Sequence, residues 1–330
     1  MATALASKQP TQLIFTARSI DKANSVAATL KKRFSSVPAI QTLQMDLSSI
    51  QSVRETAAAL REKVSRIDIL INNAGVMAIP EKTLSVDGHE MHFATNFLGH
   101  FLFTNLLVDK LAPSARIVNV TASGYVICPI RFHDIDWEGK PLPEDEEPDM
   151  NMVQQLGIGK LASAGQYNPM LAYLHSTTAL ILFSVALTER LRNKGVAALS
   201  AAPGGKWCQL YRINGRTWPE NLVVVTELQR HIGGFRNPTM EYKTATEGAA
   251  SILVAALDPA LQGVFYPSLR SYGPRTKSWT NVAHGAAHVS DCQIADTVST
   301  YAGDKKVVDK LWKVAEGMTG DTFLESLTAM

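Results

Sequence analysis

Short apolar runs of strand composition alternate with longer helical patterns along most of this 330-residue chain. The runs cover residues 12–17, 40–45, 67–72, 116–121, 196–201 and 263–267. The helical stretches lie near residues 20–34, 49–63, 84–111, 168–193 and 245–257. Most of the runs lack polar–apolar alternation, so they predict strands that are covered on both faces. The alternation therefore predicts an α/β fold with a doubly wound parallel sheet.

Local signals mark two helix starts and one late helix. Ser48 with Gln51, and Thr244 with Glu247, predict capping boxes at the starts of two of the helices. The tail 271–330 is weakly patterned, with one helix predicted at 303–317. No repeat or linker divides the chain, so residues 1–330 are predicted to form a single domain.

Two stretches interrupt the alternation of strands and helices. Residues 124–170 include an acidic, proline-bearing segment, and residues 205–243 are aromatic and basic in patches. Both follow predicted carboxyl ends of strands, where open α/β sheets bind ligands. We interpret them as insertions that surround a small-molecule substrate, and the alternative is that they are passive surface loops.

Charge and cysteine usage limit the partners and the compartment. The net charge is +2 without a basic cluster, which argues against a nucleic-acid partner. Cys128, Cys208 and Cys292 are far apart and show no metal-ligand spacing, as expected in a reducing compartment. The N-terminus lacks the apolar core of a signal peptide, and the apolar stretch 170–187 includes His175, which favours a buried helix over a membrane span. We therefore expect a cytoplasmic protein.

Two histidines have the spacing of a helical metal pair. His284 and His288 are four residues apart, but zinc needs further ligands and the sequence offers none. They are interpreted as unrelated surface or core histidines, and no metal site is predicted.

Several motifs follow the predicted strands in a fixed order. They are NNAG at 72–75, Asn96 in TNFLGHF, RIVNVTASG at 116–124, Tyr173, and Pro203–Gly204. This order and spacing resembles the short-chain dehydrogenase/reductase family over about residues 2–270, most of all its retinol-dehydrogenase-like and fungal biosynthetic members. The resemblance implies a Rossmann-like fold and an NADP-linked oxidoreductase of a small hydrophobic alcohol or ketone in secondary-metabolite biosynthesis.

The resemblance also implies residues that bind the adenosine part of a cofactor. Asn73, Ala74 and Gly75 would line the adenine ribose. Asp46, followed by Leu47, would accept a hydrogen bond from the adenine amino group. The alternative for Asp46 is a helix-entry residue beside the serine that follows Leu47.

The two ends of the cofactor would meet other segments. Arg18 follows the first predicted strand, where the family places a basic residue that pairs with the 2′-phosphate of NADP, and a guanidinium suits phosphate. The alternative for Arg18 is a surface arginine. Pro203 and Gly204 would border the nicotinamide.

Catalysis in the family uses serine, tyrosine, lysine and asparagine. Tyr173 would be the general acid/base and Asn96 would hold a relay water, but the residue four positions after Tyr173 is Thr177 rather than lysine. A free tyrosine has a pKa of about 10, so about one molecule in a thousand is phenolate at neutral pH. Lys206 either approaches the same cleft or is a surface lysine.

The family serine aligns with Ala122, and Ser123 is its neighbour. Adjacent side chains of a strand point to opposite faces, so Ser123 would act only where the strand end bulges or turns. The alternative is a turn-forming serine before Gly124.

The family's first strand and its TGxxxGxG phosphate loop have no counterpart in the sequence. Residues 1–8 resemble the end of the helix that follows this loop, and the pair Gly157 and Gly159 follows no strand, so we treat it as coincidental. Because the missing strand is central in the family's sheet, either the sheet closes over the gap or the natural chain has more residues upstream.

These departures leave three functions open. The first is an NADP(H)-linked reductase or dehydrogenase with weakened catalytic residues and weak cofactor binding. The second is a non-redox isomerase, cyclase or dehydratase on the same fold. The third is a non-catalytic partner subunit, since family members pair through the helix that carries the tyrosine, which predicts a homo- or heterodimer through 168–193.

Overall fold

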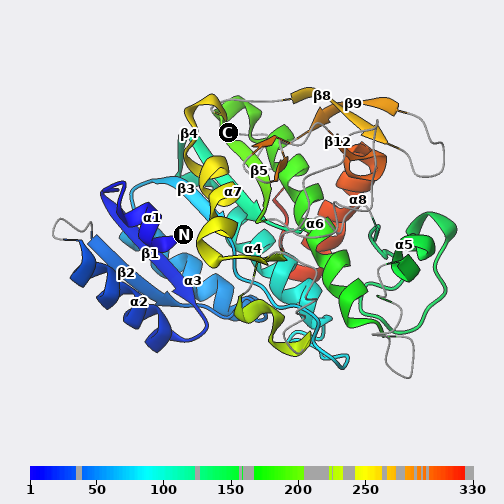
Figure 1. Ribbon diagram of the computed structural model, residues 1–330, viewed down its shortest axis with the longest axis horizontal. Coiled ribbons are helices and arrows are strands. Elements are labelled where there is room, and N and C mark those ends of the chain that lie inside the picture. Colours follow the sequence, from blue (N-terminus) through cyan, green and yellow to red (C-terminus); the bar gives the residue numbers. More distant parts are fainter. Residues whose placement is uncertain are drawn as a thin grey trace.

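The computed structural model describes most of the chain, with gaps mainly in its second half (Figure 1). The described residues are 1–34, 39–122, 127–155, 158, 167–203, 223–224, 226–232, 242–261, 266–272, 279–285, 288–290, 293–294 and 297–323.

The N-terminal part is a small parallel layer. Strands β1 (Gln12–Ala17) and β2 (Ala39–Gln44) pair in parallel, and α2 (Ile20–Arg33) connects them. α1 (Ala2–Ala6) and α2 cover the same face, because Ala6 of α1 packs in one cluster with residues of both strands and of α2. The predicted strands and helix of this region are confirmed within one residue.

The main sheet has five strands in the order β11-β10-β5-β4-β3. Their bounds are β3 Ile67–Asn72, β4 Leu111–Val120, β5 Ala197–Ala202, β10 His288–Ser290 and β11 Gln293–Ile294. All neighbours pair in parallel except β11, which is antiparallel to β10. The predicted α/β fold with a parallel sheet is confirmed.

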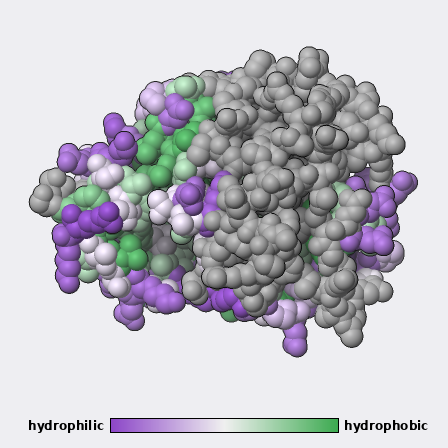
Figure 2. Space-filling model, in the orientation of Figure 1, coloured by the Kyte–Doolittle hydropathy of each residue, from purple (hydrophilic) through white to green (hydrophobic). Residues whose placement is uncertain are grey.

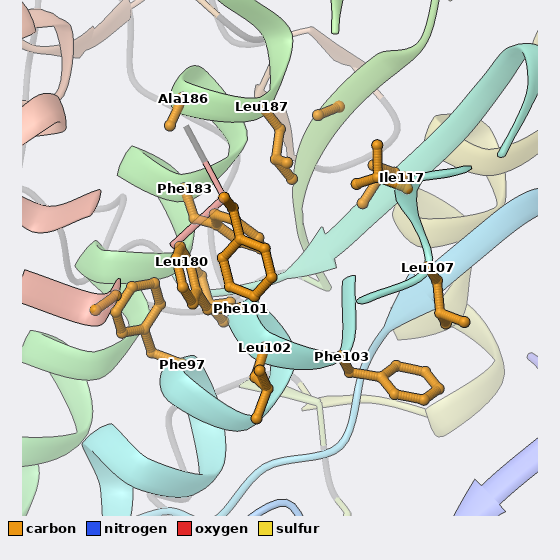
Figure 3. Packing of buried hydrophobic residues seen from close by; sticks show 14 of the residues in the cluster. Phe97, Phe101, Leu102, Phe103, Leu107, Ile117, Leu180, Phe183, Ala186 and Leu187 are labelled. Atoms are coloured by element: carbon orange, nitrogen blue, oxygen red, sulfur yellow. The ribbon is translucent and has the colours of Figure 1, made fainter. Parts of the chain in front are cut away.

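Helices cover both faces of the main sheet, as alternating strand residues require. Ile117 of β4 faces α4 (Gly99–Leu106) and α6 (Pro169–Arg190), whereas Val118 faces α7 (Ala245–Leu257). Figure 3 shows Phe97, Phe101 and Phe183 packed together on the first face. α3 (Ile50–Lys63) packs against α4 through the same core.

The C-terminal helix α8 (Lys305–Thr319) lies along α6, so that α6 is enclosed (Figure 1). Among the described residues, α6 is the one helix whose length and composition would allow it to cross a membrane, and 94% of its most apolar window is buried inside the protein. The prediction of a buried helix over 170–187 is confirmed, and so is the late helix predicted at 303–317.

The two sheets do not join. Within the described residues, β1 and β3 share no ladder of hydrogen bonds, so each presents an open edge. Ile69 of β3 is 37% exposed, and Figure 2 shows apolar residues at the surface between the β1–β2 pair and α7. Met1 packs against the α7 side of the main sheet, so α1 lies between the two sheets. The sheet therefore does not close over the gap, contrary to the first of the two outcomes that the sequence allows.

Three local predictions are wrong. Ser49, not Ser48, caps α3, because its side chain accepts from the Ser52 N–H while the Ser48 hydroxyl donates to Asp46. The helix predicted over 84–111 begins only at residue 91, because residues up to Glu90 form an extended loop with a short bridge between Leu84 and Glu90. The capping box at Thr244 is confirmed.

The third wrong prediction is the sixth strand. The place beside β5 is taken by β10, whereas the stretch predicted at 263–267 enters β8 (Tyr266–Tyr272), which belongs to another sheet. That sheet pairs β8 with β9 (Trp279–Gly285) and β12 (Thr297–Ser299). The expected insertions contain α5 (Met150–Gln155), β6 (Val223–Val224) and β7 (Tyr242–Lys243) among their described residues.

Candidate cofactor and catalytic site

The predicted cofactor residues lie at the carboxyl edge of the sheets. Asn72 of β3 pairs with Asn119 of β4, which pairs with Ser200 of β5, so the segments that follow these strands lie side by side. Asn73 and Pro203 are therefore placed along one edge, where parallel sheets bind ligands. In the smaller sheet, Ala17 pairs with Gln44, which brings the segments of Arg18 and Asp46 together.

A layer of buried polar side chains supports this edge, and the sequence analysis did not predict it. The Asn72 side-chain amide donates to Asn119 Oδ1 (2.8 Å) and to Thr104 Oγ1 (2.9 Å). The Asn119 amide in turn donates to Ser184 Oγ of α6 (2.8 Å). These bonds fix α4 and α6 to the ends of β3 and β4, because buried polar groups must keep their partners. An asparagine inside an apolar strand run was the available signal.

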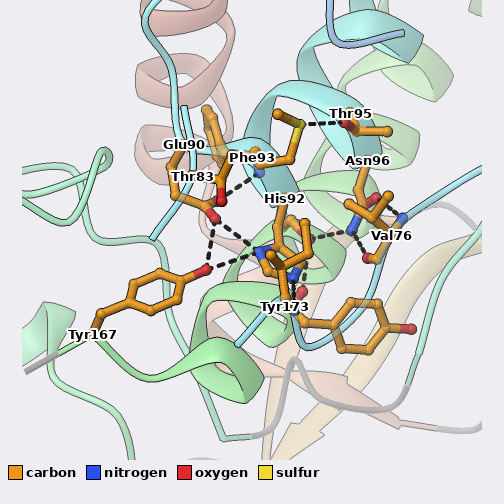
Figure 4. A network of polar contacts seen from close by, with 12 residues as sticks. Val76, Thr83, Glu90, His92, Phe93, Thr95, Asn96, Tyr167 and Tyr173 are labelled. Atoms are coloured by element: carbon orange, nitrogen blue, oxygen red, sulfur yellow. Dashed lines mark hydrogen bonds and ion pairs between the residues drawn. The ribbon is translucent and has the colours of Figure 1, made fainter. Parts of the chain in front are cut away.

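Asn96 joins the turn after β3 to the helix of Tyr173. It lies in a π-helical segment, Phe93–Leu98, a rare conformation that is frequent at functional sites. Its Oδ1 accepts from the Val76 N–H (2.7 Å), and its amide donates to the Val76 carbonyl and to Ser176 Oγ (both 2.9 Å). A Cβ on Gly75 would lie 2.9 Å from Asn96 Oδ1, so the close approach requires glycine there. Figure 4 shows this arrangement.

Tyr173 lies on the first turns of α6, partly buried, next to this asparagine. Ser176 Oγ donates to the Tyr173 carbonyl (2.7 Å), and the Tyr173 and His92 rings are 6.4 Å apart. Figure 4 shows the phenol pointing away from Tyr167. Burial alone raises the pKa of Tyr173 to about 12, because no charged group among the described residues contributes to the shift.

Thr177 supplies no substitute for the family's lysine. Its side chain is buried and donates to the Leu174 carbonyl of its own helix (2.8 Å), and its carbonyl accepts from Thr121 Oγ1 (2.9 Å). The position therefore stabilises α6 and its contact with the segment that follows β4, and it places no positive charge near the phenol. Lys206 lies outside the described residues.

A buried acid–histidine–tyrosine cluster next to Tyr173 was also missed. Glu90 Oε1 lies 2.7 Å from His92 Nδ1 and accepts from the Tyr167 hydroxyl (3.0 Å), while Glu90 Oε2 accepts from the Phe93 N–H (2.9 Å). His92 Nε2 accepts from the Ile79 N–H (3.3 Å), so the proton is on Nδ1. The cluster ties the loop at Ile79 and the start of α6 to the π-helical segment (Figure 4). Burial and Glu90 raise the pKa of Tyr167 far above its ordinary value.

The predicted adenosine contacts are accessible in different degrees. Arg18, Asn73 and Ala74 are exposed, which leaves them free to meet a ligand. Asp46 Oδ1 accepts from the Ser48 N–H (2.9 Å) and hydroxyl (2.6 Å), so the helix-entry role is present, while no described residue bonds its second oxygen. The side chain of Leu47 is buried, so only its backbone could contact a ligand.

The remaining predicted residues are placed in part. Pro203 and Ala122 are partly exposed at the ends of β5 and β4. Ser123 and Gly204 lie outside the described residues, as do Gly157 and Gly159. The choice between a catalytic and a turn-forming Ser123 therefore stays open.

Metal and thiol chemistry find no support in the part of the chain that the structure describes. No group of three or more potential metal ligands occurs among these residues. Burial raises the pKa of the Cys128 thiol to about 12, which makes it a poor nucleophile.

The comparisons with known proteins agree with this geometry. The family described as short chain dehydrogenase matches residues 1–126. Oxidoreductase fscI of Fusarium equiseti is 38% identical over 211 residues, which cover 62% of this chain and 80% of that protein. Mouse (Mus musculus) retinol dehydrogenase 11 is 31% identical over 280 residues, covering 84% of this chain and 69% of that protein. Against human (Homo sapiens) retinol dehydrogenase 13, at 37% identity, the match covers 59% of this chain and 46% of that protein.

A solved structure shares the fold over nearly the whole chain. An uncharacterized protein from Mycobacterium paratuberculosis superimposes with a TM-score of 0.60 at 25% identity, over 98% of this chain and 88% of that one. The chain therefore belongs to the short-chain dehydrogenase/reductase family of oxidoreductases and is similar to its retinol dehydrogenases.

Proposed function

We propose that this chain binds NADP(H) and reduces a small hydrophobic ketone or aldehyde, with slow turnover, in a secondary-metabolite pathway. The proposal rests on the bonds of Asn96, which connect the turn 73–76, exposed at Asn73 and Ala74, to Ser176, one turn after Tyr173. A nucleotide on the turn and a carbonyl at the phenol would then be neighbours. The similarity to a fungal oxidoreductase supports the class of reaction.

The residues present fit the adenosine half of NADP(H). The turn of exposed Asn73 and Ala74 and partly buried Gly75 offers backbone groups for the ribose, and the exposed guanidinium of Arg18 suits a 2′-phosphate. The free oxygen of Asp46 can accept from an amino group. When bound, the nicotinamide would supply or accept the hydride.

Tyr173 supports reduction better than oxidation. With a pKa of about 12, about one molecule in 10⁵ carries phenolate at pH 7. Carbonyl reduction needs a proton donor, which the neutral phenol is, whereas alcohol oxidation needs a base. The absence of a cation from position 177 also weakens the phenol as an acid, so we expect slow turnover in both directions.

The surroundings of Tyr173 suit an apolar substrate. Tyr173 and Met77 pack, partly buried, against a cluster that includes Ala78, Cys128 and Leu171. A substrate at the phenol would contact these apolar side chains, and its carbonyl would be its main polar contact.

A non-redox reaction is the second candidate, and the state of Tyr173 favours it. A phenol that keeps its proton can polarise a carbonyl by hydrogen bonding without any hydride transfer. An isomerase, cyclase or dehydratase would use Tyr173 in this way. Such a reaction would not depend on Arg18 or on the turn 73–76.

Nucleotide binding separates the two candidates. NADPH is titrated against the purified chain and its fluorescence is followed, with Arg18→Ala as the matched variant. We expect a Kd in the micromolar range, weakened about tenfold in Arg18→Ala because one phosphate contact is lost. No binding up to millimolar NADPH would exclude the redox proposal. Conversion of a carbonyl substrate without nicotinamide would select the second candidate.

A further inference from the structure

His100 is a buried histidine whose only hydrogen bond to a described residue reaches the turn 73–76, the nucleotide turn. It lies in α4, four residues after Asn96, and only 3% of it is exposed. Its Nε2 lies 2.8 Å from the Ala74 carbonyl oxygen. Because a carbonyl can only accept, Nε2 carries the proton and Nδ1 is a bare acceptor.

No contact in the described part of the core offsets the free-energy cost of burying the His100 ring. Nδ1 is buried and has no partner among the described residues, which destabilises the folded state. Burial lowers the pKa of His100 to about 4, so the ring gains no charge at neutral pH. A phenylalanine ring would fill a similar volume without an unsatisfied nitrogen. The bond to Ala74 is therefore what a histidine adds here.

This bond fixes the direction of one peptide group. In a trans peptide, the C=O and the following N–H point in opposite directions, and the described backbone has no cis bond. With the Ala74 oxygen turned inward onto His100, the Gly75 N–H is turned away from α4. No described residue accepts from this N–H, and the adjoining Ala74 is exposed. Asn96 fixes the other end of the turn at Val76.

We propose that His100 is a positioning residue for the nucleotide, holding the Ala74–Gly75 peptide so that the Gly75 N–H can donate to an oxygen of the ligand. This role rests on the proposed function, in which the ligand is NADP(H). His100 touches no ligand itself and acts through the turn.

Substitution of His100 tests the role. In His100→Phe we expect amide exchange of the free protein at Val76, whose N–H donates to Asn96, to accelerate about tenfold, and the Kd for NADPH to weaken about fivefold. The urea midpoint of unfolding should stay equal or rise, because the orphaned nitrogen is gone. His100→Gln can place an amide N–H near the Nε2 position, so both properties should return to within about twofold of the parent.

His175 provides the matched control. It too is fully buried, and its Nδ1 has no partner in the described part of the chain, but its Nε2 accepts from the Arg131 N–H, remote in sequence from the turn. His175→Phe should leave exchange at Val76 and the Kd for NADPH unchanged.

The results separate this role from the proposed function. Unchanged exchange at Val76 in His100→Phe would overturn the role, and so would a lowered urea midpoint with an unchanged Kd. If the parent chain binds no NADPH, the proposed function fails, while faster exchange in His100→Phe and its recovery in His100→Gln would still support the positioning of the turn.

Discussion

At the residue scale, Thr177 decides how well Tyr173 can transfer a proton. The threonine hydroxyl donates to the Leu174 carbonyl of its own helix (2.8 Å). It therefore provides no positive charge near the phenol. A lysine there lies one helical turn from Tyr173, where its charge would lower the pKa of the phenol.

Replacing Thr177 with lysine is therefore expected to raise the rate of carbonyl reduction by about tenfold or more, since a positively charged neighbour should lower the pKa of Tyr173 by at least about one unit. The rate of NADPH oxidation with a panel of hydrophobic ketones measures this. Thr177→Met is the control, because methionine is similar in bulk to lysine but carries no charge. Equal rates in the two variants would show that Tyr173 is not the acid or that another step limits turnover, and circular dichroism checks that both fold.

The buried histidines predict a pH dependence of stability. Burial lowers the pKa of His100 to about 4 and of His175 to about 3, from 6.5. Between pH 6.5 and 5 the unfolded chain binds protons at both residues that the folded chain does not. The free energy of unfolding should therefore decrease as the pH is lowered from 6.5 to 5, by up to about 1.4 kcal/mol per pH unit for each histidine.

Urea unfolding at pH 6.5, 6 and 5 measures this slope, and His100→Phe should remove about half of it. His89 does not reverse the effect, because Asp136 raises its pKa and its stabilising contribution is fully present below pH 6.5. A slope that is the same in the parent and in the variant would contradict the burial of a neutral His100.

At the scale of elements, the open edge of β3 is the feature that separates this sheet from a continuous one. Ile69 on this edge is 37% exposed, whereas Ile117 on the neighbouring β4 is fully buried. The two isoleucines therefore differ in their packing although they lie on paired strands.

We expect Ile69→Lys to lower the free energy of unfolding by less than about 1 kcal/mol, as for a surface position. Ile117→Ala should cost about 2–5 kcal/mol, because it leaves a cavity in the core. Urea unfolding of both variants measures the difference. A cost for Ile69→Lys as large as for Ile117→Ala would contradict the partial exposure of Ile69 and the open edge of β3.

Elements with strong local signals were predicted well, and those that depend on distant pairing were not. α7 was predicted with its bounds of residues 245–257, since its apolar pattern and the Thr244 capping box are local. β10 was missed because it has three residues and takes its place only by pairing with β5. The hydrogen bond from Tyr167 to Glu90 joins residues 77 positions apart, which no periodicity reveals.

At the scale of the whole molecule, α8 closes the core over α6. Trp312 packs against Phe101 at a ring distance of 5.0 Å, and the guanidinium of Arg190 lies 4.2 Å over its ring. Pairing of two chains through 168–193 stays a prediction, and it would require α8 to leave this position.

Trp312→Ala is expected to lower the free energy of unfolding by about 3–5 kcal/mol, as for a buried tryptophan. Lys313→Ala on the exposed side of α8 should change it by less than about 0.5 kcal/mol. Urea unfolding compares the two. Sedimentation of Trp312→Ala should show more self-association than the parent if α6 is a pairing surface, and equal costs in the two variants would show that α8 does not dock as described.

The sequence by itself determined the α/β class, most strands of the sheet, and the order of Asn73, Asn96 and Tyr173 along the chain, because these depend on local composition and spacing. The tertiary structure alone decided that the two sheets stay apart, that Asn96 bonds Ser176, and that His100 holds Ala74. Those features are contacts between segments distant in sequence, and their energies appear only when the segments pack together.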